Sequence, residues 1–247
     1  MEEKFITTDL NNVGINQIID LRHHRKSPSP GADATKPKYQ LITPSGLIYF
    51  KFGLTENEIC AEIISHYVAT LLEIPVAKVA LAKYKNSLGI ASWDVGSYHE
   101  PEDHQSYSIK DFIHIKGFVE MCLFDYLVMN EDRHAGNWGY KEGSMRPLFD
   151  HNICFGGSQN PRDFDYFMEH VTSSLTAGGE YDNKHDSILK TLVQCEPKKV
   201  RVFLDKVKLL PQIDIQSLEG LRDYEKVKKL LSARIVYMLQ KGEEYGL

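Results

Sequence analysis

The chain has 247 residues, 42% hydrophobic and 26% charged, which is the composition of an ordinary globular protein. Its 34 acidic and 29 basic residues give a formal net charge of −5, which argues against broad nucleic-acid or membrane binding. No apolar run approaches the roughly 20 residues of a membrane span, and the N-terminus lacks the pattern of a signal peptide. We therefore expect a cytoplasmic protein without a membrane or direct nucleic-acid partner.

The cysteines and histidines are scattered along the chain. The cysteines lie mostly in apolar surroundings, at Cys60, Cys122, Cys154 and Cys195. Such spacing favours reduced core thiols over a disulfide framework. The ten histidines also lack the spacing of zinc ligands. The sequence therefore predicts neither disulfides nor a zinc site.

A loop rich in proline and small residues, 27–38, precedes the first predicted hairpin. Residues 39–43 and 47–52 have the composition of strands and are separated by Pro44-Ser45-Gly46, which predicts a β-hairpin. Lys51 lies among apolar and aromatic residues of the second strand. Burying this lysine without a partner would be costly, so we expect it to have an anionic partner.

A helix is predicted directly after this hairpin. Thr55 is a favourable N-cap, and apolar residues recur at helical spacing as far as Leu71. Glu58 and Glu62 lie one turn apart near its start. Either could pair with Lys51, as a strand lysine and a helix glutamate do where kinases order ATP phosphates. Of the two, we assign Glu58 to this role.

Two more strands and a linker complete the first part of the chain. Residues 79–84 and 88–93 have strand composition and are joined by a turn. The stretch 98–107 is rich in His, Glu, Asp and Pro, which is typical of a linker. We expect an ATP-binding N-terminal lobe, residues 1–95, and a helical catalytic lobe, residues 96–247.

The second lobe is predicted to begin with a long buried helix. Apolar residues at helical spacing predict one helix over residues 110–130. Residues 138–140 and 146–149 have the pattern of short strands joined by a turn. Helical periodicity returns in the tail, at residues 188–195, 198–209 and 224–239.

The loop between that helix and the short strands carries the strongest chemical pattern. Asp132 and Asn137 have the spacing of a protein-kinase catalytic loop, and Asp150 stands where kinases place a metal-binding aspartate. Asp132 would accept the proton of an attacking hydroxyl. Asn137 and Asp150 would hold Mg²⁺ with ATP, because Mg²⁺ prefers oxygen ligands. We expect His134 to support the loop, and Arg133 to contact a phosphate or a carboxylate.

Several ordered motifs together resemble the HipA-like kinases, the toxins of bacterial toxin-antitoxin modules. The matching segments are Ser27-Pro28-Ser29-Pro30-Gly31-Ala32, Asn57-Glu58, Ile74-Pro75-Val76, Ala91-Ser92-Trp93-Asp94, Asp132-Arg133-His134-x-x-Asn137 and Pro147-Leu148-Phe149-Asp150. The resemblance implies an α+β, two-lobed protein-kinase-like fold with a small β-rich N-lobe and a mostly helical C-lobe. It also implies ATP-dependent Ser/Thr phosphorylation with Mg²⁺, or Mn²⁺, and an aminoacyl-tRNA synthetase as the usual class of target.

The resemblance also implies roles for individual residues. Ser29, Gly31 and Ala32 would lie in a loop that contacts the phosphates of ATP. Ser92 and Trp93 would lie at the hinge that holds adenine. Ser27 or Ser29 would be autophosphorylated, and the added negative charge could hold the loop outside the cleft and lower activity.

The chain departs from the full-length members of this family. It is short, as in compact members that receive the N-terminal subdomain as a separate polypeptide, and Asp33 stands where Gln is common. An antitoxin or such a subdomain is therefore an expected partner.

Two other functions stay open. The string Asp132-Arg133-His134-x-x-Asn137 is also the form found in phosphoinositide kinases, which would need a basic groove and a membrane-facing surface. A pseudokinase that binds nucleotide and acts as an interaction module would keep the fold. It would lose one of four residues, all of which are present: Lys51, Asp132, Asn137 and Asp150.

Overall fold

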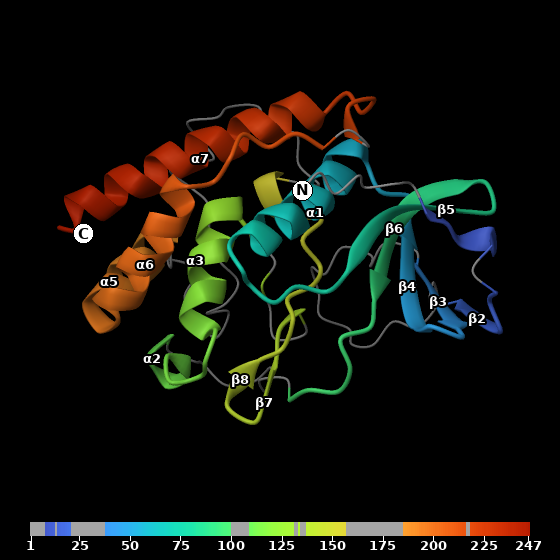
Figure 1. The fold of residues 1–247 in the computed structure, drawn as a ribbon, viewed down its shortest axis with the longest axis horizontal. Helices are drawn as coiled ribbons and strands as arrows, with labels where there is room; N and C mark the ends of the chain where they lie inside the picture. The colour runs from blue at the N-terminus through green and yellow to red at the C-terminus, as the bar shows by residue number, and fades with distance from the viewer. Residues whose placement is uncertain are drawn as a thin grey trace, which may run out of the picture.

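A six-stranded sheet and a group of helices lie at opposite ends of the molecule (Figure 1). The computed structural model describes residues 8–12, 14–20, 38–99, 109–130, 133, 137–156, 185–215 and 218–247. The sheet has the order β1-β5-β6-β4-β3-β2, with β1 parallel to β5 and the other pairs antiparallel. Its strands are β1 (Thr8–Asp9), β2 (Gln17–Asp20), β3 (Lys38–Thr43), β4 (Gly46–Phe52), β5 (Val79–Tyr84) and β6 (Ser87–Trp93).

Both predicted hairpins of the first half form, as β3–β4 and β5–β6. In the first, Gly46 has φ 120°, which L side chains rarely adopt, and Thr43 Oγ1 donates to the Gly46 carbonyl at 2.8 Å. Strands β4 and β6 pair with each other and join the two hairpins into one sheet. Lys51 on β4 therefore pairs with Ile90 in the middle of β6, while Tyr49, two positions earlier, pairs with Ser92 near the end of β6.

Helix α1 (Glu56–Leu71) lies between the sheet and the C-terminal helices (Figure 1). Thr55 caps it as predicted, since its side chain accepts the Glu58 backbone N–H at 3.2 Å. The buried apolar residues of α1 belong to one cluster with those of the C-terminal helices and with the residues on one face of β5 and β6. This helix therefore ties the sheet to the helical part.

The predicted helix over residues 110–130 is wrong in one respect, because the chain forms two helices, α2 (Ile109–Phe112) and α3 (Phe118–Val128). Gly117, at the N-cap of α3, has φ 90°. Just before it, the backbone of Lys116 bonds to Gly143 and Met145 of the hairpin β7–β8 (Tyr140–Lys141, Ser144–Met145). These contacts take the place of helical hydrogen bonds, which the apolar periodicity did not reveal.

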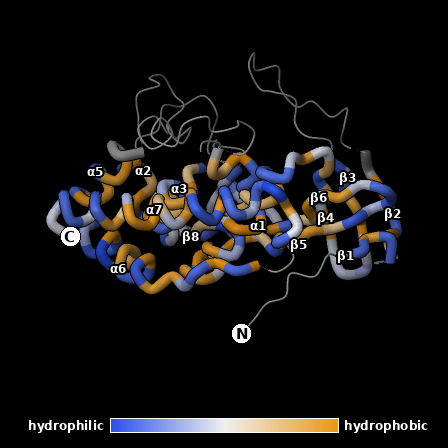
Figure 2. The backbone as a smooth tube through the Cα atoms, turned by 90° about the horizontal axis from the view of Figure 1, so that it is seen from above, coloured by the Kyte–Doolittle hydropathy of each residue, from blue (hydrophilic) through white to orange (hydrophobic). Residues whose placement is uncertain are grey.

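The tail contains the three predicted helices, α5 (His185–Cys195), α6 (Pro197–Lys208) and α7 (Tyr224–Glu244). In Figure 2 all three alternate hydrophobic and hydrophilic residues along their length, as expected for helices with one buried face. Helix α7 packs across α1, α3 and α6. Among the helices of the described ranges, none is long and apolar enough to cross a membrane.

The fold class is α+β, with a β-rich part and a helical part, as predicted. The four cysteines are free thiols, also as predicted. The division into lobes at residues 95 and 96 stays a prediction.

Candidate functional site

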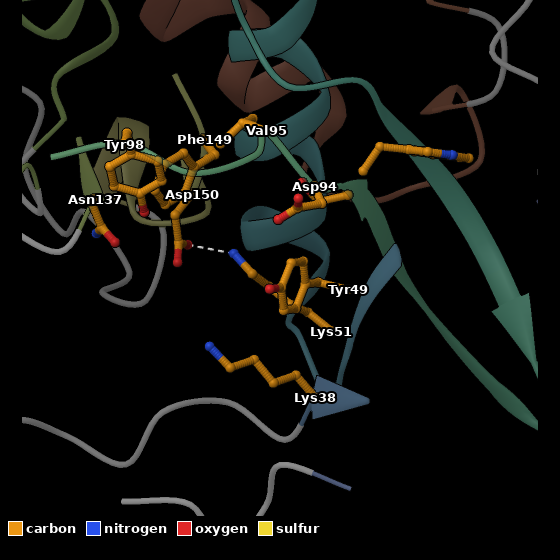
Figure 3. Close-up of a pocket in the computed structure, with 11 residues that line it drawn as sticks. Lys38, Tyr49, Lys51, Asp94, Val95, Tyr98, Asn137, Phe149 and Asp150 are labelled. Carbon is orange, nitrogen blue, oxygen red and sulfur yellow. Dashed lines mark hydrogen bonds and ion pairs between the residues drawn. The ribbon is translucent and has the colours of Figure 1, made fainter. Parts of the chain in front are cut away.

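A pocket of about 240 Å³ lies between the sheet and the segments that flank the hairpin β7–β8 (Figure 3). Its lining includes residues predicted from the sequence, at Lys51, Ser92, Trp93, Asn137 and Asp150. It also includes Asp94 of the predicted hinge motif, and residues that the sequence analysis did not assign to the site, at Lys38, Tyr49, Val95, Tyr98 and Phe149. The fold thus brings distant parts of the chain to one cavity.

Lys51 has the anionic surroundings that its position in β4 predicts. Its Nζ donates to Asp150 Oδ1 at 2.5 Å and to Asn152 Oδ1 at 3.4 Å, and it lies 3.9 Å from Glu62 Oε2. The Lys51 side chain is 12% exposed. A largely buried ammonium is therefore compensated by two carboxylates, those of Asp150 and Glu62.

The assignment of Glu58 as the helix partner of Lys51 needs correction, because Glu62 is the carboxylate of α1 next to that lysine. Glu58 Oε2 instead accepts the Thr55 backbone N–H at 2.7 Å and completes a capping box. A glutamate at the third helical position reaches back to its own N-cap. One turn later, Glu62 faces Lys51 and also accepts the His151 backbone N–H at 2.9 Å.

Asp150 adopts a backbone conformation that is rare for its residue type. Its φ is 62°, in the left-handed region that favours glycine, and such strain persists mainly at functional positions. Burial alone would raise the pKa of Asp150, but the charge and hydrogen bond of Lys51, with smaller effects of Lys38 and His151, outweigh burial and lower it. The carboxyl group is therefore ionised at neutral pH.

Aromatic side chains form walls that sequence reasoning missed. Tyr98 and Phe149 lie with ring centroids 5.9 Å apart on the side of the pocket opposite the sheet (Figure 3). Tyr49 precedes Lys51 by two positions on β4 and therefore faces the same side of the sheet. The alternation of side chains between the two faces of β4 could be predicted from the sequence, whereas the contact between Tyr98 and Phe149 depends on tertiary folding.

Lys38 is the other residue that the sequence analysis overlooked. It pairs in register with Lys51 across β3 and β4. Figure 3 shows both side chains pointing from the sheet towards Asp150. If the register of the predicted hairpin is counted outward from its turn, Lys38 falls opposite Lys51, so the sequence could have predicted that the two lysines lie side by side.

Some of the predicted site residues lie outside the described residues. They are Ser27, Ser29, Gly31, Ala32, Asp132 and His134. Their expected roles stay predictions.

The donors in the pocket fit a magnesium ion. Asn137 supplies an amide oxygen and Asp150 a carboxylate, and both line the same cavity. No group of three or more His, Cys, Asp or Glu suited to a metal gathers within the described part of the chain. A cation here would therefore also need oxygens from ATP phosphates, which is the usual way proteins bind Mg²⁺.

Comparison with known proteins establishes the fold. No protein-family model matches this sequence, and no curated protein matches it. Among solved structures, the proinflammatory kinase CtkA of Helicobacter pylori is similar, with a TM-score of 0.58 and 17% identity over 98% of this chain and 100% of CtkA. HipA of Shewanella oneidensis MR-1, solved with HipB and operator DNA, has a TM-score of 0.46 and 11% identity over 90% of this chain and 66% of HipA. The chain has the α+β fold of the kinase CtkA.

Proposed function

We propose that this chain is an ATP-dependent phosphotransferase of the HipA-like type, which phosphorylates Ser or Thr hydroxyls of a protein. The observation that carries the proposal is that Lys51, Asn137 and Asp150 meet in one pocket. A nucleotide-binding pseudokinase would be expected to lack one of these three residues or Asp132, and all four are present in the sequence. The likeness of the fold to that of a kinase supports the same reading.

The sheet side of the pocket suits the phosphates of ATP. Lys38 and Lys51 bring two positive charges to the same region. Ammonium groups bind phosphate oxygens as strong point charges. Lys51 would exchange its direct bond with Asp150 for contacts to the phosphates, while Glu62 keeps it oriented.

The aromatic walls suit the base. Tyr49 lies on the sheet side, with Tyr98 and Phe149 opposite (Figure 3). An adenine ring between them would bury its faces against aromatic surface. Ser92 and Trp93 would then lie at its edge, where backbone groups can read its nitrogens.

The chemistry follows from the ligand set. Mg²⁺, when bound with ATP, would neutralise charge that develops on the phosphates. Asn137 and Asp150 would hold it, and Asp132 would accept the proton of the attacking hydroxyl. The hydroxyl oxygen forms a bond to the γ-phosphorus while the bond to the β–γ bridging oxygen breaks, and ADP leaves with that electron pair.

The substrate and partner come from the sequence resemblance. It supports a translation-related target such as an aminoacyl-tRNA synthetase, and an antitoxin or a separate N-terminal subdomain as partner. A cytoplasmic location follows from those roles. The name of CtkA, a proinflammatory kinase, supports a phosphotransferase and names no target.

The experiment that tests the proposal measures transfer of γ-phosphate from ATP with Mg²⁺ or Mn²⁺. Acceptors are a panel of aminoacyl-tRNA synthetases and, separately, liposomes that contain phosphatidylinositol. Label in a synthetase that disappears with Asp132→Asn and Asp150→Asn supports the proposal. Label in lipid alone would favour the phosphoinositide-kinase alternative, and ATP binding without transfer to any acceptor would favour a pseudokinase.

A further inference from the structure

The guanidinium of Arg133 contacts both segments that supply the metal ligands. Its Nη1 donates to the Asn137 carbonyl at 2.8 Å and to the Phe149 carbonyl at 3.0 Å. Asn137 is itself a metal-ligand candidate, and Phe149 directly precedes the other, Asp150. One nitrogen atom therefore holds the backbone at both ligands.

The other side of the same guanidinium is fixed to α3. Nε and Nη2 of Arg133 donate to Asp125 Oδ2 and Oδ1, both at 2.9 Å. Asp125 Oδ1 also accepts from Asn130 Nδ2 at 2.9 Å. Because α3 is buried along almost its whole length, Asp125 is a fixed reference point inside the core.

Arg133 is fully buried, at 0% exposure. The sequence analysis expected Arg133 to contact either a phosphate or a carboxylate. The structure shows the carboxylate of Asp125, and the buried side chain cannot reach a phosphate in the pocket. A buried ion pair adds little net stability by itself, because desolvation offsets the attraction. What this pair does provide is a planar fork whose donors have fixed directions, which a lysine cannot reproduce.

We propose that Arg133 is a positioning residue that sets the separation of the two metal ligands, Asn137 and Asp150. The inference rests on the proposed function, since it concerns the metal–ATP site of that activity. Carbonyls bonded to one nitrogen keep a fixed distance from each other. Loss of Arg133 lets the two segments move independently, and the metal then loses affinity even though both ligands remain.

The test uses a variant designed to keep the fold, Asp125→Asn combined with Arg133→Met. The pair of substitutions removes both charges together, so that no uncompensated charge stays buried. The asparagine keeps an acceptor for Asn130, while the donors to the Asn137 and Phe149 carbonyls are lost. Arg133→Lys is the second variant, since it keeps the charge beside Asp125 but lacks the fork.

The measurement is the affinity for Mn²⁺ in the presence of a non-hydrolysable ATP analogue, together with the unfolding temperature and ATP affinity in EDTA. Both variants should bind Mn²⁺ about 10–100-fold more weakly, which is the usual effect of removing a group that orients metal ligands. ATP affinity in EDTA should stay as in the wild type. If either variant does not fold, the other decides.

Arg234→Lys is the matched control. Arg234 is also buried, at 1% exposure, and donates to the Tyr126 carbonyl of the same helix α3, next to Asp125. Unchanged Mn²⁺ affinity in this control supports the proposal, and an equal loss there would overturn it, because packing of α3 would then be the cause. Wild-type affinity in the Arg133 variants would overturn it as well. If the wild type itself bound no metal with ATP, the proposed function would be wrong, and the positioning role with it.

Discussion

Lys51 Nζ lies 2.5 Å from Asp150 Oδ1, although 99 positions separate the two residues in the chain. The contact joins β4 of the sheet to the segment after the hairpin β7–β8. The ion pair neutralises the charge of a largely buried lysine and that of an aspartate with a strained backbone. When metal and ATP bind, Lys51 would bind the phosphates and Asp150 would bind the metal. The direct ion pair therefore fits the unliganded state of the site, in which the two charges neutralise each other.

This pair should make stability depend on pH. The folded pKa of Asp150 is lowered, because Lys51 outweighs the effect of burial. Its contribution is therefore present above the unfolded pKa of about 4 and is lost as pH falls through the folded pKa. Lys51→Met should lower the free energy of unfolding by about 1–3 kcal/mol at pH 7, and by less below pH of about 4.

Urea unfolding of the wild type and Lys51→Met across this pH range measures the difference. Lys83→Met serves as the control, since Lys83 is exposed on β5, which β6 separates from β4. A gap between wild type and Lys51→Met that widened as the pH fell would contradict the assigned sign.

Glu62 and Glu58 should separate site function from helix stability. Glu62→Gln removes the carboxylate next to Lys51 while keeping an acceptor for the His151 N–H, so ATP affinity and turnover should fall. Glu58→Gln keeps an oxygen that can accept the Thr55 N–H but removes a negative charge from the first turn of α1, so it should cost about 0.3–1 kcal/mol of stability with wild-type ATP affinity. Thermal unfolding and ATP titration of both variants test this, and the reverse outcome would restore Glu58 to the site.

Lys38 should act as a second phosphate-binding lysine. It lines the pocket and points to the same region as Lys51 (Figure 3). Hydrogen bonds between charged groups contribute about 1.5–3 kcal/mol, so Lys38→Ala should weaken ATP by roughly ten- to a hundredfold. Adenosine should bind equally well to variant and wild type. Calorimetric titration of both ligands checks this, and equal losses for adenosine and ATP would show that Lys38 shapes the pocket instead.

The sequence predicted most elements because their signals are local. Both hairpins of the sheet follow turn residues, α1 begins at a capping threonine, and the tail helices follow apolar periodicity. The break before α3 was missed because Lys116 uses its backbone for a hairpin that lies later in the chain. Long-range pairing of this kind leaves no local pattern.

The candidate site also contains some residues that local sequence patterns predicted and others that only the tertiary fold reveals. Lys51, Asn137 and Asp150 were predicted from spacing and residue type, and they share the pocket. The choice between Glu58 and Glu62 depends on where α1 packs, since both lie in its first turns. The role of Arg133 depends on carbonyl groups, which every residue has, so no side-chain pattern reveals it.

Gly89 should be required for the position of Lys51. It lies in β6 opposite Phe52, and a Cβ added there would lie 2.0 Å from the Lys51 carbonyl oxygen. Gly89→Ala should therefore push β4 and β6 apart, lower stability by about 1–3 kcal/mol, and weaken ATP binding. Gly220→Ala is the control, since nothing lies within 4 Å of its added Cβ. Thermal unfolding of both decides, and equal stability would mean that the strands relax without cost.

Autophosphorylation should occur on Ser27 or Ser29, in the predicted phosphate loop. A serine that swings out of the loop can meet Asp132 of another molecule, and a phosphoserine adds about two negative charges. Held by Lys36 or Arg25, it would keep the loop from covering ATP and lower activity. Mass spectrometry after incubation with ATP and Mg²⁺ should find phosphate at these positions in the wild type and not in Asp132→Asn. Equal phosphate in both proteins, or none at either serine, would disprove this regulation.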